Sequence, residues 1–140
     1  MCRRSFLLAG LLVTVAGLVI SGCGGEAGRA SEVAGIYWGD VFGDDTGIIR
    51  FYISPRGTLN GNIRVSACAN PIQIFGIVDA SGGVTWHGTG CGVTFRGTGN
   101  VEPLAPGSPV WVGQGTWRAT NGTTGTWGVR RQARTGSISV

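Results

Sequence analysis

Hydrophobic and polar residues alternate with a period of two along most of the chain after residue 34. Turn-forming residues interrupt this alternation roughly every 8 to 12 positions. The clearest example is the segment 58–66, where aliphatic residues and glycine alternate with asparagine and arginine. A strand with this pattern turns one face to a core and the other to water. The pattern predicts eight strands, at residues 34–42, 47–54, 58–66, 71–79, 83–88, 92–100, 109–119 and 123–132.

Short segments rich in Gly, Asn, Asp and Pro separate several of these strands, at residues 44–47, 54–57, 80–83 and 120–122. Turns this short join antiparallel neighbours. The predicted architecture is therefore all-β, a single antiparallel up-and-down β-barrel of about eight strands over residues 34–132. A C-terminal tail follows at residues 133–140.

The first 22 residues have the organisation of a lipoprotein signal peptide. Two arginines precede an uncharged apolar run at residues 6–20, which is shorter than the roughly 20 residues that a membrane-spanning helix needs. The run ends in the motif Ile-Ser-Gly-Cys at residues 20–23, which resembles a lipobox, the cleavage and acylation site of bacterial lipoproteins. We therefore expect Cys23 to become the lipidated N-terminus after residues 1–22 are removed.

Two or three acyl chains on Cys23 would anchor the protein stably, with residues 23–33 as a short tether. The expected location is the cell membrane or an outer membrane, with the barrel facing the periplasm or the exterior. Residues 3–7, Arg-Arg-Ser-Phe-Leu, also resemble a twin-arginine export motif. Both the general secretory route and the twin-arginine route therefore stay open.

All 11 basic residues of the chain are arginines, so lysine is not available as a Schiff base, a general base or a phosphate ligand. Once the signal peptide is removed, the chain has nine arginines and seven acidic residues. This excess of positive charge is too small to indicate nucleic-acid binding. The 27 glycines follow no collagen period and are scattered among strand-forming residues. Composition therefore predicts one folded domain that holds no cofactor and binds no nucleic acid.

The chain has four cysteines, of which Cys2 leaves with the signal peptide and Cys23 is lipidated. Cys68 and Cys91 remain, and outside the cytoplasm we expect them to form a disulfide. Two cysteines and one histidine cannot fill a structural zinc site, so no metal site is predicted. In an eight-strand meander, the segments that carry the two cysteines fall at the same end of the barrel.

Four short segments repeat glycine next to an aromatic or leucine: 35–38 (Gly-Ile-Tyr-Trp), 57–61 (Gly-Thr-Leu-Asn-Gly), 115–117 (Gly-Thr-Trp) and 125–127 (Gly-Thr-Trp). These segments resemble the hairpins of avidin-like meander barrels and of small bacterial protease-inhibitor barrels. The resemblance covers nearly all of the mature domain and implies the same barrel fold. It does not imply biotin binding, because no biotin-binding residues can be matched position by position.

Candidate catalytic and calcium-binding groups are few. The single histidine, His87, lies on the outward face of its predicted strand, where we expect a solvated residue rather than part of a serine–histidine–carboxylate triad. Asp40, Asp44 and Asp45 gather near the first hairpin. Turn capping is the better explanation for them, because calcium requires six or more oxygen ligands and the neighbouring residues supply few.

The five tryptophans either fill the barrel or line a cavity. Filling is favoured because an eight-stranded barrel has little spare volume. If one end stays open, Trp86, Trp117 and Trp127 are its expected wall and a candidate site for a small apolar ligand. A second candidate is the outer surface, where the alternation leaves four large apolar residues outside: Ile48, Tyr52, Phe75 and Ile77. Apolar residues exposed together favour a partner surface.

These features predict a membrane-anchored, non-enzymatic envelope lipoprotein that binds a protein partner or a small apolar ligand. The alternative is a barrel-type inhibitor of a protease or another hydrolase, in which residues 26–32 would act as the inserted arm. An enzyme is the least favoured class, because the chain has few titratable groups.

Overall fold

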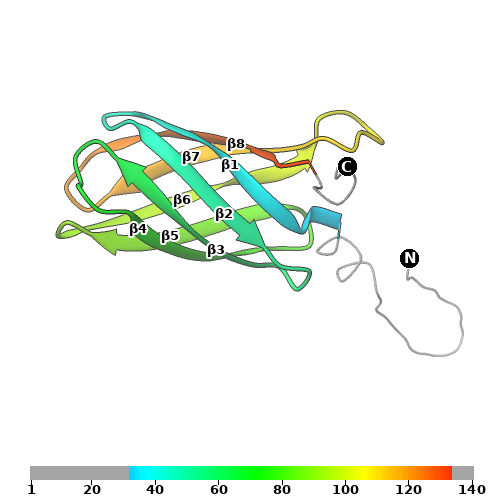
Figure 1. Ribbon diagram of the computed structural model, residues 1–140, viewed down its shortest axis with the longest axis horizontal. Coiled ribbons are helices and arrows are strands. Elements are labelled where there is room, and N and C mark those ends of the chain that lie inside the picture. Colours follow the sequence, from blue (N-terminus) through cyan, green and yellow to red (C-terminus); the bar gives the residue numbers. More distant parts are fainter. Residues whose placement is uncertain (1–31, 134–140) are drawn as a thin grey trace, which may run out of the picture.

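In the computed structural model, which describes residues 32–133, the chain forms a closed antiparallel barrel of eight strands (Figure 1). The strands are β1 (Gly35–Gly43), β2 (Gly47–Ile53), β3 (Thr58–Val65), β4 (Ile72–Val78), β5 (Gly83–Gly90), β6 (Val93–Pro103), β7 (Trp111–Ala119) and β8 (Thr124–Arg131). The predicted all-β up-and-down architecture is confirmed. Strand β6 ends three residues later than expected, because its ladder with β7 continues through Val101 opposite Gly113 to Pro103 opposite Trp111.

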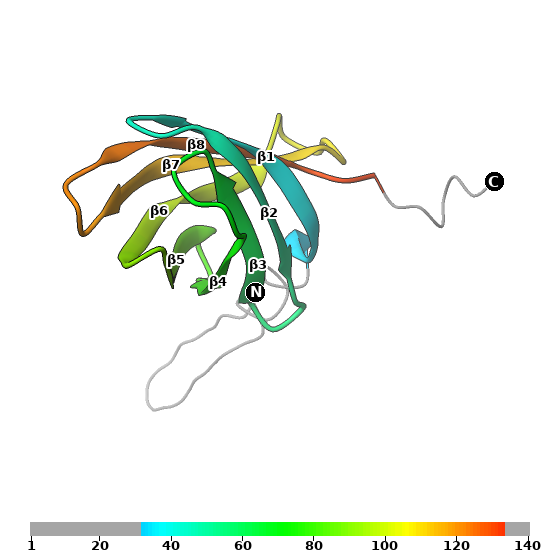
Figure 2. The same ribbon diagram turned by 60° about the vertical axis from the view of Figure 1, so that its left-hand side comes forward.

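Each strand pairs with the next along the chain, and β8 closes the wall by pairing with β1. That closing ladder runs from Tyr37 opposite Arg131 to Gly43 opposite Gly125. Figure 2 shows the strands curving round into this continuous wall. Closure satisfies the edge hydrogen bonds that an open sheet would expose to other chains.

The barrel has two chemically different ends. At the terminal end, β1 begins and β8 ends, beside the turns 54–57 and 79–82 and the loop 104–110. At the opposite end, which we call the disulfide end, lie the turns 44–46, 66–71, 91–92 and 120–123.

No helix within residues 32–133 is long and apolar enough to cross a membrane.

Aspartate carboxylates hold several of the turns. Asp79 Oδ1 accepts hydrogen bonds from the backbone N–H and hydroxyl of Ser81 and from the Gly83 N–H, and these bonds, the Ser81 hydroxyl first, lower the pKa of Asp79. Asp44 Oδ2 accepts from the Thr124 N–H at 2.9 Å, and Asp45 Oδ1 accepts from Thr46 N–H and Ser66 Oγ–H. Turn capping by Asp44 and Asp45 is therefore confirmed. Asp40 does not cap a turn, because it lies within β1 on the outward face, opposite Ile48 of β2 and Gly128 of β8.

The inward face predicted for the segment 58–66 is confirmed, because Leu59, Ile63 and Val65 are buried. Buried side chains from all eight strands meet in one core, and among the described residues no buried side chain is charged or polar. The largest fully buried side chains include Trp127, Tyr37 and Phe51. A core of this kind stabilises the barrel through apolar burial and dispersion contacts.

Candidate functional site

The three tryptophans predicted as a ligand wall all lie inside the barrel. Trp86, Trp117 and Trp127 are 2, 4 and 2 % exposed. The rings of Trp86 and Trp127 meet edge to face with centroids 6.4 Å apart, and Trp117 packs on Phe95 with centroids 5.8 Å apart. Packed in this way, the rings occupy the space that a ligand between them would need. Ligand binding at these residues stays a prediction.

Glycines on neighbouring strands make room for these rings. Trp86 pairs directly with Gly97, and a Cβ added at Gly97 would overlap the Trp86 ring. Trp117 pairs with Gly125, where a Cβ would lie 2.6 Å from the indole nitrogen of Trp117. Glycine beside a large aromatic, seen already in the sequence, is therefore a packing arrangement in which one strand supplies the ring and the next leaves a space.

Two of the three buried indoles also hydrogen bond to the barrel wall. Trp117 Nε1–H donates to the Phe42 carbonyl at 3.0 Å, and Trp127 Nε1–H lies 3.2 Å from the carbonyls of both Thr98 and Thr116. Trp86 differs, because its Nε1 is the buried side-chain polar atom that lacks a partner among the described residues. Packing alone holds the Trp86 ring.

The second predicted site lies on the outer surface, as the alternation indicated. Ile48, Tyr52, Phe75 and Ile77 are 49, 47, 51 and 58 % exposed. We call these four residues the apolar patch. Tyr52 and Phe75 lie in one row across the sheet, since each pairs with Asn60 of β3. The row continues to His87, whose ring centroid lies 6.5 Å from that of Phe75.

Arginines accompany the apolar patch. Arg50 lies between Ile48 and Tyr52 on β2, and Arg64 pairs with Ile48 from β3. Both arginines are exposed, and strands β2–β5 contain no acidic residue. The patch therefore combines apolar contact area with positive charge.

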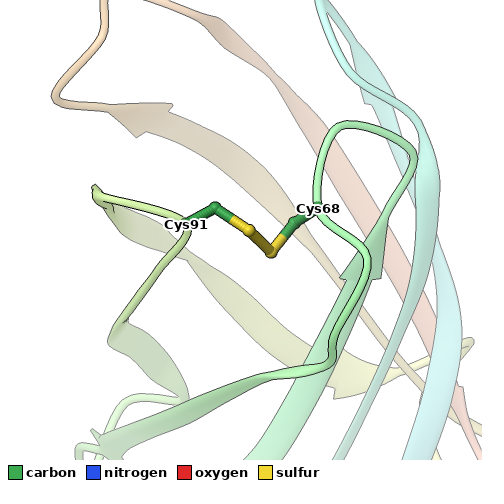
Figure 3. The surroundings of a disulfide bond; sticks show 2 residues. All are labelled: Cys68 and Cys91. Atoms are coloured by element: carbon green, nitrogen blue, oxygen red, sulfur yellow. A yellow bond between two sulfur atoms is a disulfide. The ribbon is translucent and has the colours of Figure 1, made fainter.

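The predicted disulfide is confirmed. Cys68 and Cys91 are bonded with their Cα atoms 5.9 Å apart, and the bond joins the 66–71 turn to the β5–β6 turn at one end of the barrel (Figure 3). Cys91 has a φ of 53° and the following Gly92 a φ of 75°. Two positive φ values in succession match the two-residue hairpin turn that suits twisted strands.

At the terminal end, the guanidinium of Arg131 ties three segments together. Its Nη1 donates to the carbonyls of Glu32 and Ala34 at 2.7 and 3.2 Å, and its Nη2 donates to the Pro109 carbonyl at 3.2 Å. The guanidinium carbon also lies 5.5 Å from the centre of the Trp111 ring. Arg131 thus joins the segment before β1, the end of β8 and the β6–β7 loop.

Tyr37 lies beneath this junction and is fully buried. Its hydroxyl donates to the Val33 carbonyl at 2.9 Å. Burial raises the pKa of Tyr37 to about 12, against the opposing effect of the Arg131 guanidinium. This tyrosine is therefore a structural group that stays neutral in the folded protein over the physiological pH range.

His87 is exposed and contacts Phe75, and no side-chain hydrogen bond to it is found within the described part of the chain. Across residues 32–133, no group of three or more His, Cys, Asp and Glu side chains is placed to hold a metal ion. Cys23, the signal peptide and residues 26–31 of the proposed inhibitor arm lie outside the described residues. Lipidation and the inhibitory arm therefore stay predictions.

Sequence reasoning missed two exposed aromatic residues on β1, Trp38 and Phe42, which are 56 and 52 % exposed. The signal was present in the alternation, because the inward residues Tyr37 and Val41 directly precede Trp38 and Phe42. Comparison of the chain with protein-family models, with curated proteins and with solved structures finds no match. Function must therefore be argued from the surfaces of the barrel.

Proposed function

We propose that this protein is a lipid-anchored, non-enzymatic protein of the cell envelope that binds a protein partner through the apolar patch. The observation that carries the proposal is the exposure of four large apolar residues on β2 and β4, the two strands that flank β3: Ile48, Tyr52, Phe75 and Ile77. Large apolar residues that gather on a surface and are rimmed by polar groups favour an interaction site.

The surroundings of the patch indicate the kind of partner. Tyrosine and arginine are enriched among the residues that dominate binding energy at protein interfaces. Arg50 and Arg64 supply positive charge, and strands β2–β5 carry no acidic residue. One carboxylate borders the patch from β1, where Asp40 pairs with Ile48. A partner with an apolar centre and an acidic rim would complement this face.

A protein partner is favoured over a small apolar ligand, because buried tryptophan rings occupy the barrel interior. Carrier barrels need an open cavity there. The scarcity of candidate catalytic groups supports a non-enzymatic role. The two described groups with resolved pKa shifts, Tyr37 and Asp79, act in the terminal junction and in a turn.

Anchoring at Cys23 would also orient the barrel. Nine chain steps separate Cys23 from Glu32, so the tether can reach at most about 30 Å. The terminal end would then face the membrane, and the disulfide end would point away from it. In cells given labelled fatty acid, we expect label on the wild type and none on Cys23→Ala; label on that variant would contradict lipidation at Cys23.

Site-specific photo-crosslinking in intact cells tests the partner surface. A photoreactive residue at position 52 should give a discrete crosslinked protein, because Tyr52 lies within the patch. The matched control is position 104, since Leu104 is an apolar residue 59 % exposed in a loop at the terminal end. Phe75→Ser should remove the crosslinked product at 52 without lowering the melting temperature, because that side chain lies outside the core.

Charge reversal sharpens the test. Arg50→Glu with Arg64→Glu should also remove the product if the partner is acidic. Equal crosslinking from positions 52 and 104 would contradict the proposal. So would a hydrolytic activity of the purified protein that His87→Ala abolishes.

A further inference from the structure

Gly128 differs from the other glycines in the strands. At each of the others, an added Cβ would come closer than 3.0 Å to a neighbouring atom, which explains why glycine is there. At Gly128 the nearest atom is the Gly113 carbonyl oxygen at 3.9 Å, and the residue faces outward between Thr126 and Arg130. Neither packing nor backbone conformation therefore requires glycine at position 128. A strand glycine of this kind often marks a place that a ligand approaches closely.

The missing side chain lies in a groove on the outer face of β7, β8 and β1, which lie side by side in Figure 1, and the groove extends onto β6. Two adjoining depressions of about 740 and 710 Å³ share Gln114 and Gly128 in their walls. We call them together the Gly128 groove. The backbone of Gly128 forms its floor at the point where the two depressions meet.

Two exposed aromatic side chains flank this groove. Trp38 lines one depression and Phe42 the other. Both are on the outward face of β1, four residues apart, so their Cα atoms are separated by about 13 Å. The groove therefore has an apolar platform towards each end.

Polar side chains occupy the middle. Asp40 and Gln114 pair directly with Gly128 from either side, and Arg130 follows on β8. All three are exposed, and within residues 32–133 no side-chain hydrogen bond joins them to another protein group. Their carboxylate, amide and guanidinium groups supply both acceptors and donors that are free for a ligand.

We propose that the Gly128 groove binds a linear oligosaccharide. Sugar rings with equatorial hydroxyls have flat apolar faces, which stack on aromatic side chains, and polar edges, which hydrogen bond to groups such as Asp40 and Gln114. A floor without a side chain lets a flat ring approach the backbone. The groove is shallow and open, which suits a chain lying across the wall better than an acyl tail that must be enclosed.

This site adjoins the apolar patch, because Asp40 of β1 pairs with Ile48 of β2. The two proposals rest on different residues, and the groove does not depend on the proposed protein partner. The remaining tryptophans help the test. Four of the five are at most 7 % exposed, whereas Trp38 is 56 % exposed. Quenching of tryptophan emission by acrylamide therefore reports mainly on Trp38.

The experiment uses the full chain in a detergent whose head group contains no sugar. Chitotetraose and cellotetraose are the probes, and titration calorimetry measures the affinity in parallel. We expect a bound oligosaccharide to reduce quenching of Trp38. Gly128→Val fills the groove with a side chain that meets open space, so it should keep the melting temperature and weaken binding by at least about tenfold. Trp38→Ala should weaken binding to a similar degree.

Phe75→Ser is the matched control, because it removes an exposed aromatic residue from the other face and should leave saccharide affinity unchanged. Three results would overturn the proposal. The first is that neither oligosaccharide protects Trp38 or gives heat. The second is equal affinity of Gly128→Val and the wild type. The third is protection of Trp38 by an acidic peptide or by vesicles of anionic lipid in place of the oligosaccharides.

Discussion

The two halves of the barrel wall fill one interior in different ways. Strands β2–β4 point medium-sized aliphatic side chains inward, among them Ile49, Ile63 and Ile74. Strands β5–β8 instead combine large aromatic side chains with inward glycines, as in the pair of Trp86 on β5 and Gly97 on β6. A closed barrel needs inward side chains whose total volume fills its interior. Residues of even size can supply this volume, and so can large residues placed beside glycines.

The two arrangements should respond differently to substitution. In the aliphatic half, residues of similar size pair with one another, as Ile63 does with Ile49 and Ile72, so we expect the loss of one methyl to be tolerated. In the tryptophan–glycine half, each ring depends on a space in the neighbouring strand. The aromatic series Tyr37, Phe51, Trp127 and Trp86 crosses between the halves, with ring centroids 5.6, 6.2 and 6.4 Å apart in succession.

The largest difference should follow truncation of a central ring. Trp127→Ala removes a side chain that is 2 % exposed and contacts both Phe51 and Trp86. We expect the free energy of unfolding to fall by about 3–5 kcal/mol, measured by urea denaturation. Ile74→Val in the aliphatic half should cost only about 0.5–1.5 kcal/mol. Equal losses would mean that the two halves do not differ in the way described.

The disulfide tests whether the halves fold together. It joins the turn after β3 to the turn after β5, across a sequence separation of 23 residues. Replacing Cys68 and Cys91 by alanine should lower the free energy of unfolding by about 3 kcal/mol. Tryptophan emission and far-ultraviolet circular dichroism should still report one shared transition. Separate transitions would show that the halves unfold independently, and reductant should affect the wild type alone.

Alkaline pH tests how far buried Tyr37 stabilises β1, the strand that lies between the two halves of the wall. The pKa of Tyr37 is raised from 10.0 to about 12, so above pH 10 the unfolded chain loses a proton that the folded chain retains. The contribution of Tyr37 to the free energy of unfolding is therefore fully present below pH 10. It declines between pH 10 and pH 12, by roughly 2–3 kcal/mol in total. Tyr37→Phe should remove this decline in denaturation curves taken across the range. An unchanged slope in that variant would contradict the assignment.

The last comparison concerns the addition of a single methyl group. Gly97→Ala would overlap the Trp86 ring and should cost about 1–3 kcal/mol. Combining it with Trp86→Leu should cost less than the sum of the single changes, because the smaller side chain frees the space. Gly128→Ala is the matched control, since its methyl meets open space, and it should be neutral or slightly stabilising. Additive costs would show that the ring and the glycine are not coupled.

Much of the wall was predictable from local pattern. The segment 58–66 alternates cleanly, and its residues Leu59, Ile63 and Val65 are all buried as expected. The alternation likewise placed Tyr52 and Phe75 outside, where both are about half exposed. These predictions succeed because side-chain direction in a strand depends only on position parity.

The interior and the Gly128 groove were less predictable. Whether Trp86, Trp117 and Trp127 line a mouth or fill a core depends on how strands far apart in the chain approach one another. The groove depends on the pairing of β8 with both β7 and β1. Parity places Gly125 on the inward face of β8 and Gly128 on the outward face. Only the structure shows that Gly128 has open space above it, whereas a Cβ at Gly125 would overlap the Phe42 carbonyl.

The sequence alone determined the strands, their inward and outward faces and the pairing of Cys68 with Cys91, because alternation, turn chemistry and cysteine parity are local or countable properties. Only the tertiary structure decided that the tryptophan rings enter spaces left by glycines and that Trp38, Asp40 and Gln114 surround an empty position on β8. These arrangements depend on which strands meet when the barrel closes. A large side chain on one strand is fitted to a glycine on a neighbouring strand, and the sequence of a single strand does not show this match.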